Sequence, residues 1–177
     1  MVIVEMTERE CRAMLAGTNV ARLACARNNQ PYVVPIHFDF DGECLYSFAT
    51  LGQKIEWMRQ NPLVCLEIDE LTAHRQWASV VVFGRYEELP NTPEYEDSLR
   101  VAEGLFQRHP MWWEPASVSL AAHEPRTPIV FRIRIGRATG RRAEPDTVRT
   151  VHVQRNASEA RRPRWLARIL RRAMGRQ

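Results

Sequence analysis

The stretch from Tyr46 to Pro62, YSFATLGQKIEWMRQNP, carries residues that can bind an anion where a strand-like run gives way to a helical one. A helix N-terminus offers unpaired backbone N–H groups and the positive end of the helix dipole. Gly52 would let a ligand approach the backbone, and a cation such as Lys54 in the first turn opposes the dipole unless an anion compensates it. Two interpretations stay open: a phosphate site, or an ordinary helix start in which Thr50 and Gln53 form a capping box and the lysine is solvated.

His37 is the second residue that could do chemistry. In the strand-like run VVPIHFDF it shares its alternation phase with Val33 and Pro35, whereas Ile36 and Phe38 take the other phase. An imidazole can relay protons near neutral pH. A histidine on a strand face is, however, more often satisfied by a backbone carbonyl or by water. Considered alone, the residue favours this structural interpretation.

Motifs of several other enzyme classes do not occur in the sequence. There is no G-x-G-x-x-G, no P-loop, no H-E-x-x-H and no G-x-S-x-G. The five histidines show no metal-ligand spacing, so we expect no metal site. The four cysteines form no C-x-x-C pair and three of them lie in strand-like runs. We interpret them as reduced core residues of a cytoplasmic protein.

A sheet must position these residues, and six strand-like runs supply one. They cover residues 20–26, 32–40, 44–49, 63–68, 77–89 and 129–135. The segments RNNQP and Asp41-Gly42 indicate tight turns between the first three runs. Helices are expected at about 8–16 after a capping box, at about 51–60 before Asn61-Pro62, and from Thr92-Pro93 to about Arg108. This pattern predicts a mainly β domain built as a small closed or partly closed barrel with peripheral helices.

Charge is distributed unevenly along the chain. Its 177 residues include 45% hydrophobic and 26% charged residues, as in an ordinary globular protein, with a net charge of +4. From Val151 onward, eight arginines and one acid give +7, which leaves −3 for residues 1–150. We therefore predict a domain of residues 1–150 and a basic tail of residues 151–177, and we expect no nucleic acid partner. No apolar run approaches the roughly 18 residues of a membrane span, and no secretory signal is visible.

The tail itself predicts an amphipathic helix. Its apolar face would consist of Trp165, Leu166, Ile169, Leu170, Ala173 and Met174, with most arginines off that face. Three interpretations stay open: docking on the body or on a partner subunit, binding to an anionic membrane surface, or binding to nucleic acid. The last usually needs a larger basic surface.

The order of these motifs resembles a known family. A strand with Pro-Ile-His, an Asp-Gly hairpin, a strand ending in small residues, Gly-x-Lys, a helix ending in Asn-Pro, and the strand WASVVVFGR follow one another. Over about residues 5–145 the chain is similar to the pyridoxamine 5′-phosphate oxidase-like superfamily, closest to its nitroimidazole-resistance (Nim)-like branch. The resemblance implies a six-stranded split β-barrel that binds FMN at the interface of a homodimer.

The resemblance also implies roles for individual residues. The FMN phosphate would be held after the third strand, where a basic pair of the family is replaced by Gln53-Lys54. The second strand would pass along the flavin ring, with His37 beside flavin and substrate as a proton relay. The full set implied to bind cofactor is Val34, Pro35, Ile36, His37, Ala49, Thr50, Gln53, Lys54, Trp77 and Ser79. Ser79 stands where the oxidases carry a glutamine, and the substrate-phosphate residues of true oxidases have no visible equivalent.

The functional prediction is therefore an FMN-dependent oxidoreductase of the flavin reductase or nitroreductase type. It would act on a small organic molecule with electrons from a reduced nicotinamide. Two alternatives differ in class. One is a non-catalytic split-barrel module that holds flavin, haem or a deazaflavin. The other is a protein that associates with a membrane surface through its basic C-terminal helix.

Overall fold

The computed structural model describes residues 2–73, 76–108 and 128–144. The predicted Trp-rich segment with Trp112 and Trp113, the boundary near residue 150 and the basic tail lie outside the described residues. Their predictions therefore stay predictions. No helix within the described ranges is long and apolar enough to cross a membrane.

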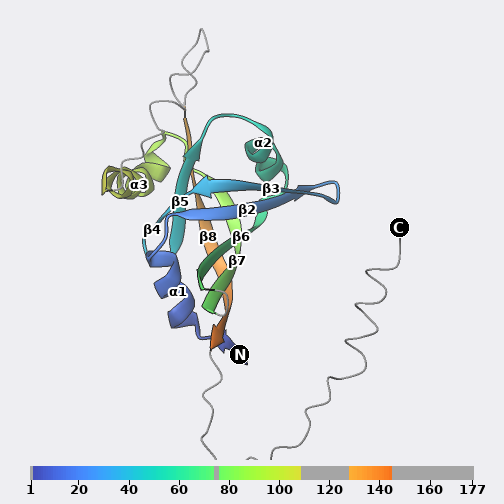
Figure 1. The fold of residues 1–177 in the computed structure, drawn as a ribbon. Coiled ribbons are helices and arrows are strands. Elements are labelled where there is room, and N and C mark those ends of the chain that lie inside the picture. Colours follow the sequence, from blue (N-terminus) through green and yellow to red (C-terminus); the bar gives the residue numbers. More distant parts are fainter. Residues whose placement is uncertain (1, 74–75, 109–127, 145–177) are drawn as a thin grey trace, which may run out of the picture. The chain divides into compact units, whose positions relative to one another are not determined.

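The described strands form one antiparallel sheet, shown in Figure 1. They are β1 (Val2–Met6), β2 (Val20–Arg27), β3 (Gln30–His37), β4 (Asp39–Phe40), β5 (Cys44–Ala49), β6 (Leu63–Ala73), β7 (Gln76–Glu88) and β8 (Ile129–Glu144). Every predicted strand is present. The structure adds β1, divides the predicted strand 32–40 into β3 and β4, and extends β8 by nine residues beyond the predicted end at residue 135.

The sheet curls back towards itself because its two end strands, β3 and β4, are continuous in sequence. The strand order is β3-β2-β6-β7-β8-β5-β4, and β1 pairs with β8 off this path. The chain passes from β3 into β4 through Phe38, whose N–H donates to the carbonyl of Asn19 at 2.9 Å. In Figure 1 the β2–β3 hairpin runs across the direction of β5, β7 and β8, as in a partly closed barrel.

Tight turns fix the strand register. Asn28 and Asn29 take positive φ angles of 50° and 63° between β2 and β3, the conformation of the turn that suits a two-residue hairpin. Between β4 and β5, Gly42 has a φ of 106°, and the Asp41 carboxylate accepts the N–H of Cys44 at 2.7 Å. Both turns were expected from the sequence.

The helices cover parts of this sheet. α1 (Glu8–Ala16) begins with the predicted capping box of Thr7 and Glu10. A 3-10 turn (Pro93–Tyr95) leads into α3 (Glu96–Arg108), which ends where predicted. α2 (Gln53–Gln60) starts two residues later than expected. The predicted capping box at Thr50 is wrong, because Gly52 is the N-cap and no side chain caps this helix.

The core lies inside the curl of the sheet. Its largest fully buried side chains include Phe38, Phe131, Leu23, Leu45, Leu66 and Ile133. α2 contributes Ile55 and Met58, both with no exposed surface. The four cysteines are all free thiols; three are buried and Cys65 is half-buried. Burial raises the pKa of each thiol, as expected for core residues.

Candidate functional site

The start of α2 presents a cation for which the described part of the chain supplies no counter-charge. Lys54 lies in the first turn and is half-buried, and burial lowers the pKa of its ammonium group. It makes no hydrogen bond or ion pair with any residue of the described ranges. Because no side chain caps the helix, its first N–H groups also remain available. An anion placed here would be attracted by both the lysine and the helix dipole.

The space in front of this helix start is open. A Cβ added to Gly52 would meet no atom within 4 Å. The backbone of Gly52 is extended, so its conformation does not require glycine. Gln53 is exposed and Thr50 is half-buried, whereas Ala49 is buried in the core and could offer only its backbone. The cradle therefore consists of Lys54, backbone groups and the two polar side chains beside it.

The predicted ring-binding strand, β3, stands at one end of the described strand order. It pairs with β2 on one side, from Gln30 opposite Arg27 to His37 opposite Val20. Ile36 is buried in the core and Val34 packs against it, while Pro35 is exposed. His37 is half-buried, and its carbonyl accepts the Ser47 hydroxyl at 2.7 Å. The predicted alternation of this strand is therefore observed, and the bond from Ser47 anchors the backbone that carries His37.

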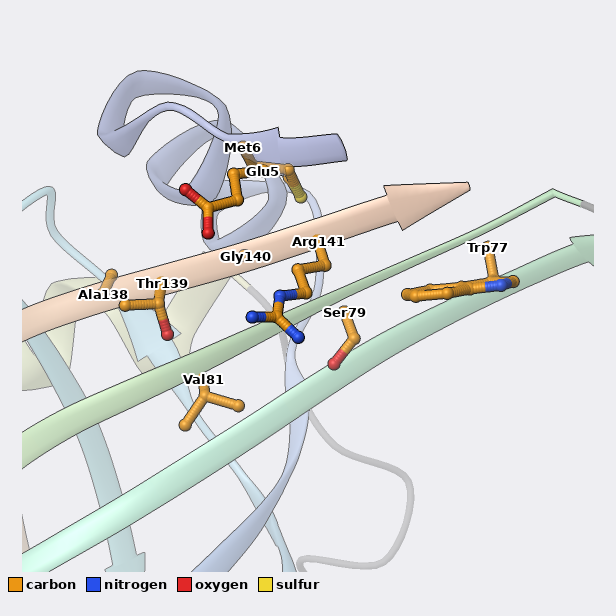
Figure 2. Close-up of a pocket in the computed structure, with 9 residues that line it drawn as sticks. All are labelled: Glu5, Met6, Trp77, Ser79, Val81, Ala138, Thr139, Gly140 and Arg141. Atoms are coloured by element: carbon orange, nitrogen blue, oxygen red, sulfur yellow. The ribbon is translucent and has the colours of Figure 1, made fainter. Parts of the chain in front are cut away.

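A pocket of about 520 Å³ lies over the paired ends of β1, β7 and β8 (Figure 2). Its lining residues are Glu5, Met6, Trp77, Ser79, Val81, Ala138, Thr139, Gly140 and Arg141. The strand register brings them together, because Ser79 lies opposite Arg141, and Arg141 lies opposite Glu5. The pocket thus joins residues that are more than 130 positions apart in sequence.

A polar cluster borders this pocket on β6. The Ser79 hydroxyl donates to Glu67 at 3.1 Å, and Arg22 donates to the same carboxylate at 3.0 Å. Arg22 also pairs with Asp69, which lies opposite Ser79 in the ladder. One arginine thus faces two carboxylates. This cluster holds the Ser79 hydroxyl in place. The predicted cofactor role of Ser79 did not depend on the cluster.

The comparisons with known proteins fit this geometry. The sequence model for pyridoxamine 5′-phosphate oxidase matches residues 7–142. The chain belongs to the pyridoxamine 5′-phosphate oxidase family. The uncharacterized protein RA0666 of Rhizobium meliloti (strain 1021) is 42% identical over 146 residues, which are 81% of this chain and 97% of that protein. The family expected from the sequence is therefore confirmed.

Solved structures of this family share the fold. A FAD-binding protein from Mesorhizobium loti is 39% identical with a TM-score of 0.68, covering 82% of this chain and 99% of its own. A candidate 5-nitroimidazole antibiotic resistance protein from Bacteroides thetaiotaomicron is 18% identical with a TM-score of 0.57, covering 82% and 93%. The second likeness concerns the fold alone. The predicted split barrel of the pyridoxamine 5′-phosphate oxidase type is confirmed.

The predicted site residues of this family member lie in three places. Ala49, Thr50, Gln53 and Lys54 surround the start of α2, Val34 to His37 form the end of β3, and Trp77 and Ser79 line the pocket. The pocket contains neither of the first two groups. No group of His, Cys, Asp or Glu side chains suited to a metal ion occurs in the described ranges.

Sequence reasoning missed Glu5, Thr139 and Arg141. Glu5 belongs to a strand that was not predicted, and the other two lie beyond the predicted end of the last strand. A signal was present in the alternation of Val2, Val4 and Met6 with polar or exposed neighbours, but a five-residue run is a weak one. These residues lie beside Trp77 and Ser79 because β8 pairs with β1 on one side and with β7 on the other.

Proposed function

We propose that the chain is a flavin-dependent oxidoreductase whose cofactor phosphate binds at the start of α2. The observation that carries the proposal is Lys54, a half-buried cation that no described residue compensates. Burial of an unpaired ammonium group costs free energy, and its lowered pKa reflects this cost. A phosphate would favour the charged form of the lysine and accept hydrogen bonds from it and from free amides of α2.

Family membership supports a flavin as the molecule that carries this phosphate. The sequence resemblance implied FMN, whereas the Mesorhizobium loti relative carries the name of a FAD-binding protein. Both cofactors share the flavin ring, and both carry a phosphate next to the ribityl chain. The cradle at Lys54 suits either one. We retain FMN as the first expectation, with FAD as the alternative.

Other predicted residues would orient the ring. One edge of β3 forms no ladder with a described strand, so its backbone groups can meet a flat polar ring edge. Trp77 and Ser79 would provide an aromatic wall and a hydroxyl. When bound, the flavin supplies the hydride or electron transfer. His37 would hold or deliver the proton that a reduced substrate needs.

The assembly proposed is a homodimer. The strands β2, β3, β6 and β7 carry exposed apolar side chains, namely Val20 at 50%, Val33 at 57%, Leu71 at 72% and Phe83 at 43% exposure. Exposed apolar surface can mark an association site. A second copy of the chain would cover it and enclose the cofactor. Sedimentation at several protein concentrations tests the assembly separately from cofactor binding.

The experiment that tests the proposed activity has two stages. First, the absorption spectrum and mass of the small molecule that co-purifies distinguish FMN and FAD from deazaflavin and haem. Second, a reduced nicotinamide is added without oxygen, and bleaching of the chromophore is followed. Bleaching and its reversal by a nitroaromatic or quinone substrate support the oxidoreductase. A bound flavin that no nicotinamide reduces would leave the cofactor-binding module as the better description.

A further inference from the structure

Ser47 lies at a core position of β5, where the strand alternation would place an apolar side chain. Leu45 and Ala49, two residues before and after it, belong to the main core cluster. Ser47 is itself only 4% exposed. Apart from cysteine and tyrosine, Ser47 and Asp39 are the two buried residues with a polar side chain in the part of the chain that the structure describes. A buried hydroxyl costs free energy unless a hydrogen bond compensates it, so this position indicates a specific partner.

The partner of the hydroxyl is the backbone at the end of β3. Ser47 donates to the carbonyl of His37 at 2.7 Å. The β2–β3 ladder ends at the pair of Val20 and His37. The β4–β5 ladder starts at the pair of Asp39 and Tyr46, so Ser47 is the first residue of β5 beyond it. No ladder joins β3 to β5 within the described ranges. The Ser47 side chain therefore forms a hydrogen bond to the chain at the place where the backbone ladders stop.

This bond connects two groups of the proposed cofactor site. Along β5, Ser47 lies two residues before Ala49, and the chain leads on to Lys54 at the start of α2. On the other side, the hydroxyl holds the end of the strand that carries His37. In Figure 1 the β3 arrow ends beside β5, in agreement with this bond. The segment expected to bind the phosphate and the strand expected along the flavin ring thus meet at one serine hydroxyl.

We propose that Ser47 is a positioning residue of the flavin site. Its hydroxyl fixes the end of β3 relative to the start of α2, so that the imidazole of His37 stays where it can deliver a proton to the substrate. This role rests on the proposed function, because Ser47 acts through His37 and needs no contact with cofactor or substrate. Proton transfer depends steeply on distance and orientation, so loosening this backbone should slow the reaction more than it weakens cofactor binding.

A purely structural role of the hydroxyl predicts a different outcome. In that case Ser47 only satisfies a buried carbonyl, and its loss would lower the stability of the fold without a specific effect on His37. Both roles predict that Ser47→Ala is less stable than wild type, so unfolding measurements do not separate them. The surroundings of the imidazole and the rate of proton transfer do separate them.

The first measurement is NMR of the histidine rings in the protein as purified, with the His37 signal assigned by its loss in His37→Ala. Ser47→Ala should shift this signal, because the ring is no longer held in the same surroundings. Ser47→Thr keeps the hydroxyl and should retain the wild-type signal. Ser98→Ala is the matched control, since it removes a serine hydroxyl of α3 that accepts a hydrogen bond from Arg132 at 2.9 Å. It should leave the His37 signal unchanged.

The second measurement is the single-turnover oxidation of the reduced protein by a quinone, followed by flavin absorbance. Ser47→Ala should slow this step by about 10-fold, and Ser47→Thr should restore most of the rate. Flavin affinity, measured by fluorescence titration, should change by less than about 2-fold in both variants, since the phosphate contacts remain. In the His37→Ala background, Ser47→Ala should change the rate by less than about 2-fold, because the residue through which Ser47 acts is absent.

Three results would overturn the proposal. They are an unchanged His37 signal in Ser47→Ala, an equal loss of rate with and without His37, and a folded Ser47→Thr that behaves like Ser47→Ala. Should Ser47→Ala fail to fold, Ser47→Cys decides, because it keeps the size of the side chain but donates weakly and must show smaller changes of the same kind.

Failure of the proposed function gives a different pattern. Normal turnover in His37→Ala would defeat the proton relay and the role of Ser47 together. Slow turnover in His37→Ala with normal turnover in Ser47→Ala would overturn the role of Ser47 alone. A protein that purifies without flavin would defeat the proposed function, while the NMR comparison would still decide whether Ser47 holds the imidazole in place.

Discussion

The start of α2 and the β1–β7–β8 pocket both present a cation that no described residue pairs with, but they are built differently. Lys54 is half-buried, and its surroundings come from one continuous segment around the β5–α2 connection. Arg141 is exposed, and its surroundings come from three strands that are far apart in sequence. Burial lowers the pKa of the first cation, whereas the second cation is exposed to solvent.

This difference suggests that the two cations suit different kinds of ligand. A desolvated charge interacts strongly with its partner because little water screens it, which suits a cofactor that remains bound. A solvated charge interacts more weakly, which suits a ligand that must enter and leave. The two regions should therefore respond to different substitutions.

The largest effect is expected for the packing that holds Lys54 in place. Ile55 has no exposed surface, so Ile55→Ala should lower the free energy of unfolding by about 2–5 kcal/mol through lost burial and a cavity. Urea unfolding of the purified protein measures it. Glu56→Ala, an exposed change on the same helix, should cost less than about 0.5 kcal/mol. Equal costs for the two variants would mean that α2 is not anchored by its apolar face.

His37 should affect turnover more than binding. His37→Ala is expected to retain the flavin but to slow substrate reduction by about 10²-fold, the usual contribution of a proton relay. Single-turnover oxidation of the reduced protein by substrate, followed by flavin absorbance, measures this step. If the variant binds less flavin while the rate per bound flavin stays unchanged, His37 is a packing residue of the β3 end.

Substitutions in the two regions should act independently. Lys54→Ala should weaken flavin binding by about 1.5–3 kcal/mol, whereas Arg141→Gln should leave it unchanged. Fluorescence titration with flavin measures the affinity of both variants. An equal loss of affinity in the two variants would show that the regions form a single site.

The smallest effect concerns the pH dependence of the pocket's framework. Glu10 accepts hydrogen bonds from Arg142 and from the Thr7 backbone, and these contacts lower its pKa from 4.5 to about 2. The resulting stabilisation is present above pH 4.5 and is lost as pH falls through about 2. Glu10→Gln should therefore flatten the dependence of the melting temperature on pH in that window. Glu103→Gln, an exposed control on α3, should leave the dependence unchanged.

Local signals predicted much of this fold. The capping box of Thr7 and Glu10 and the turns at Asn28-Asn29 and Asp41-Gly42 depend on neighbouring residues, and all three are observed. The sequence also identified Lys54 as a first-turn cation. It misplaced the cap, because the Thr50–Gln53 spacing fits a capping box but the helix begins only at Gln53.

The pocket could not be predicted because its cause is pairing between distant strands. β8 continues through GRATGRRAE, a stretch with little apolar alternation, because it pairs with both β7 and β1. The register shift beside Gly84 leaves Gly136 as an extra residue in β8. Such a bulge lets the strand bend and continue. No periodicity in the sequence signals this continuation.

The central claim is that Lys54 holds a flavin phosphate, and riboflavin tests it most directly because it has the same ring without the phosphate. Affinities for FMN and riboflavin should be measured by fluorescence titration in cofactor-free wild-type protein and in Lys54→Ala. We predict that wild type prefers FMN by about 10-fold or more and that most of this preference disappears in Lys54→Ala, with riboflavin affinity unchanged. An equal preference for FMN in both proteins would contradict the account.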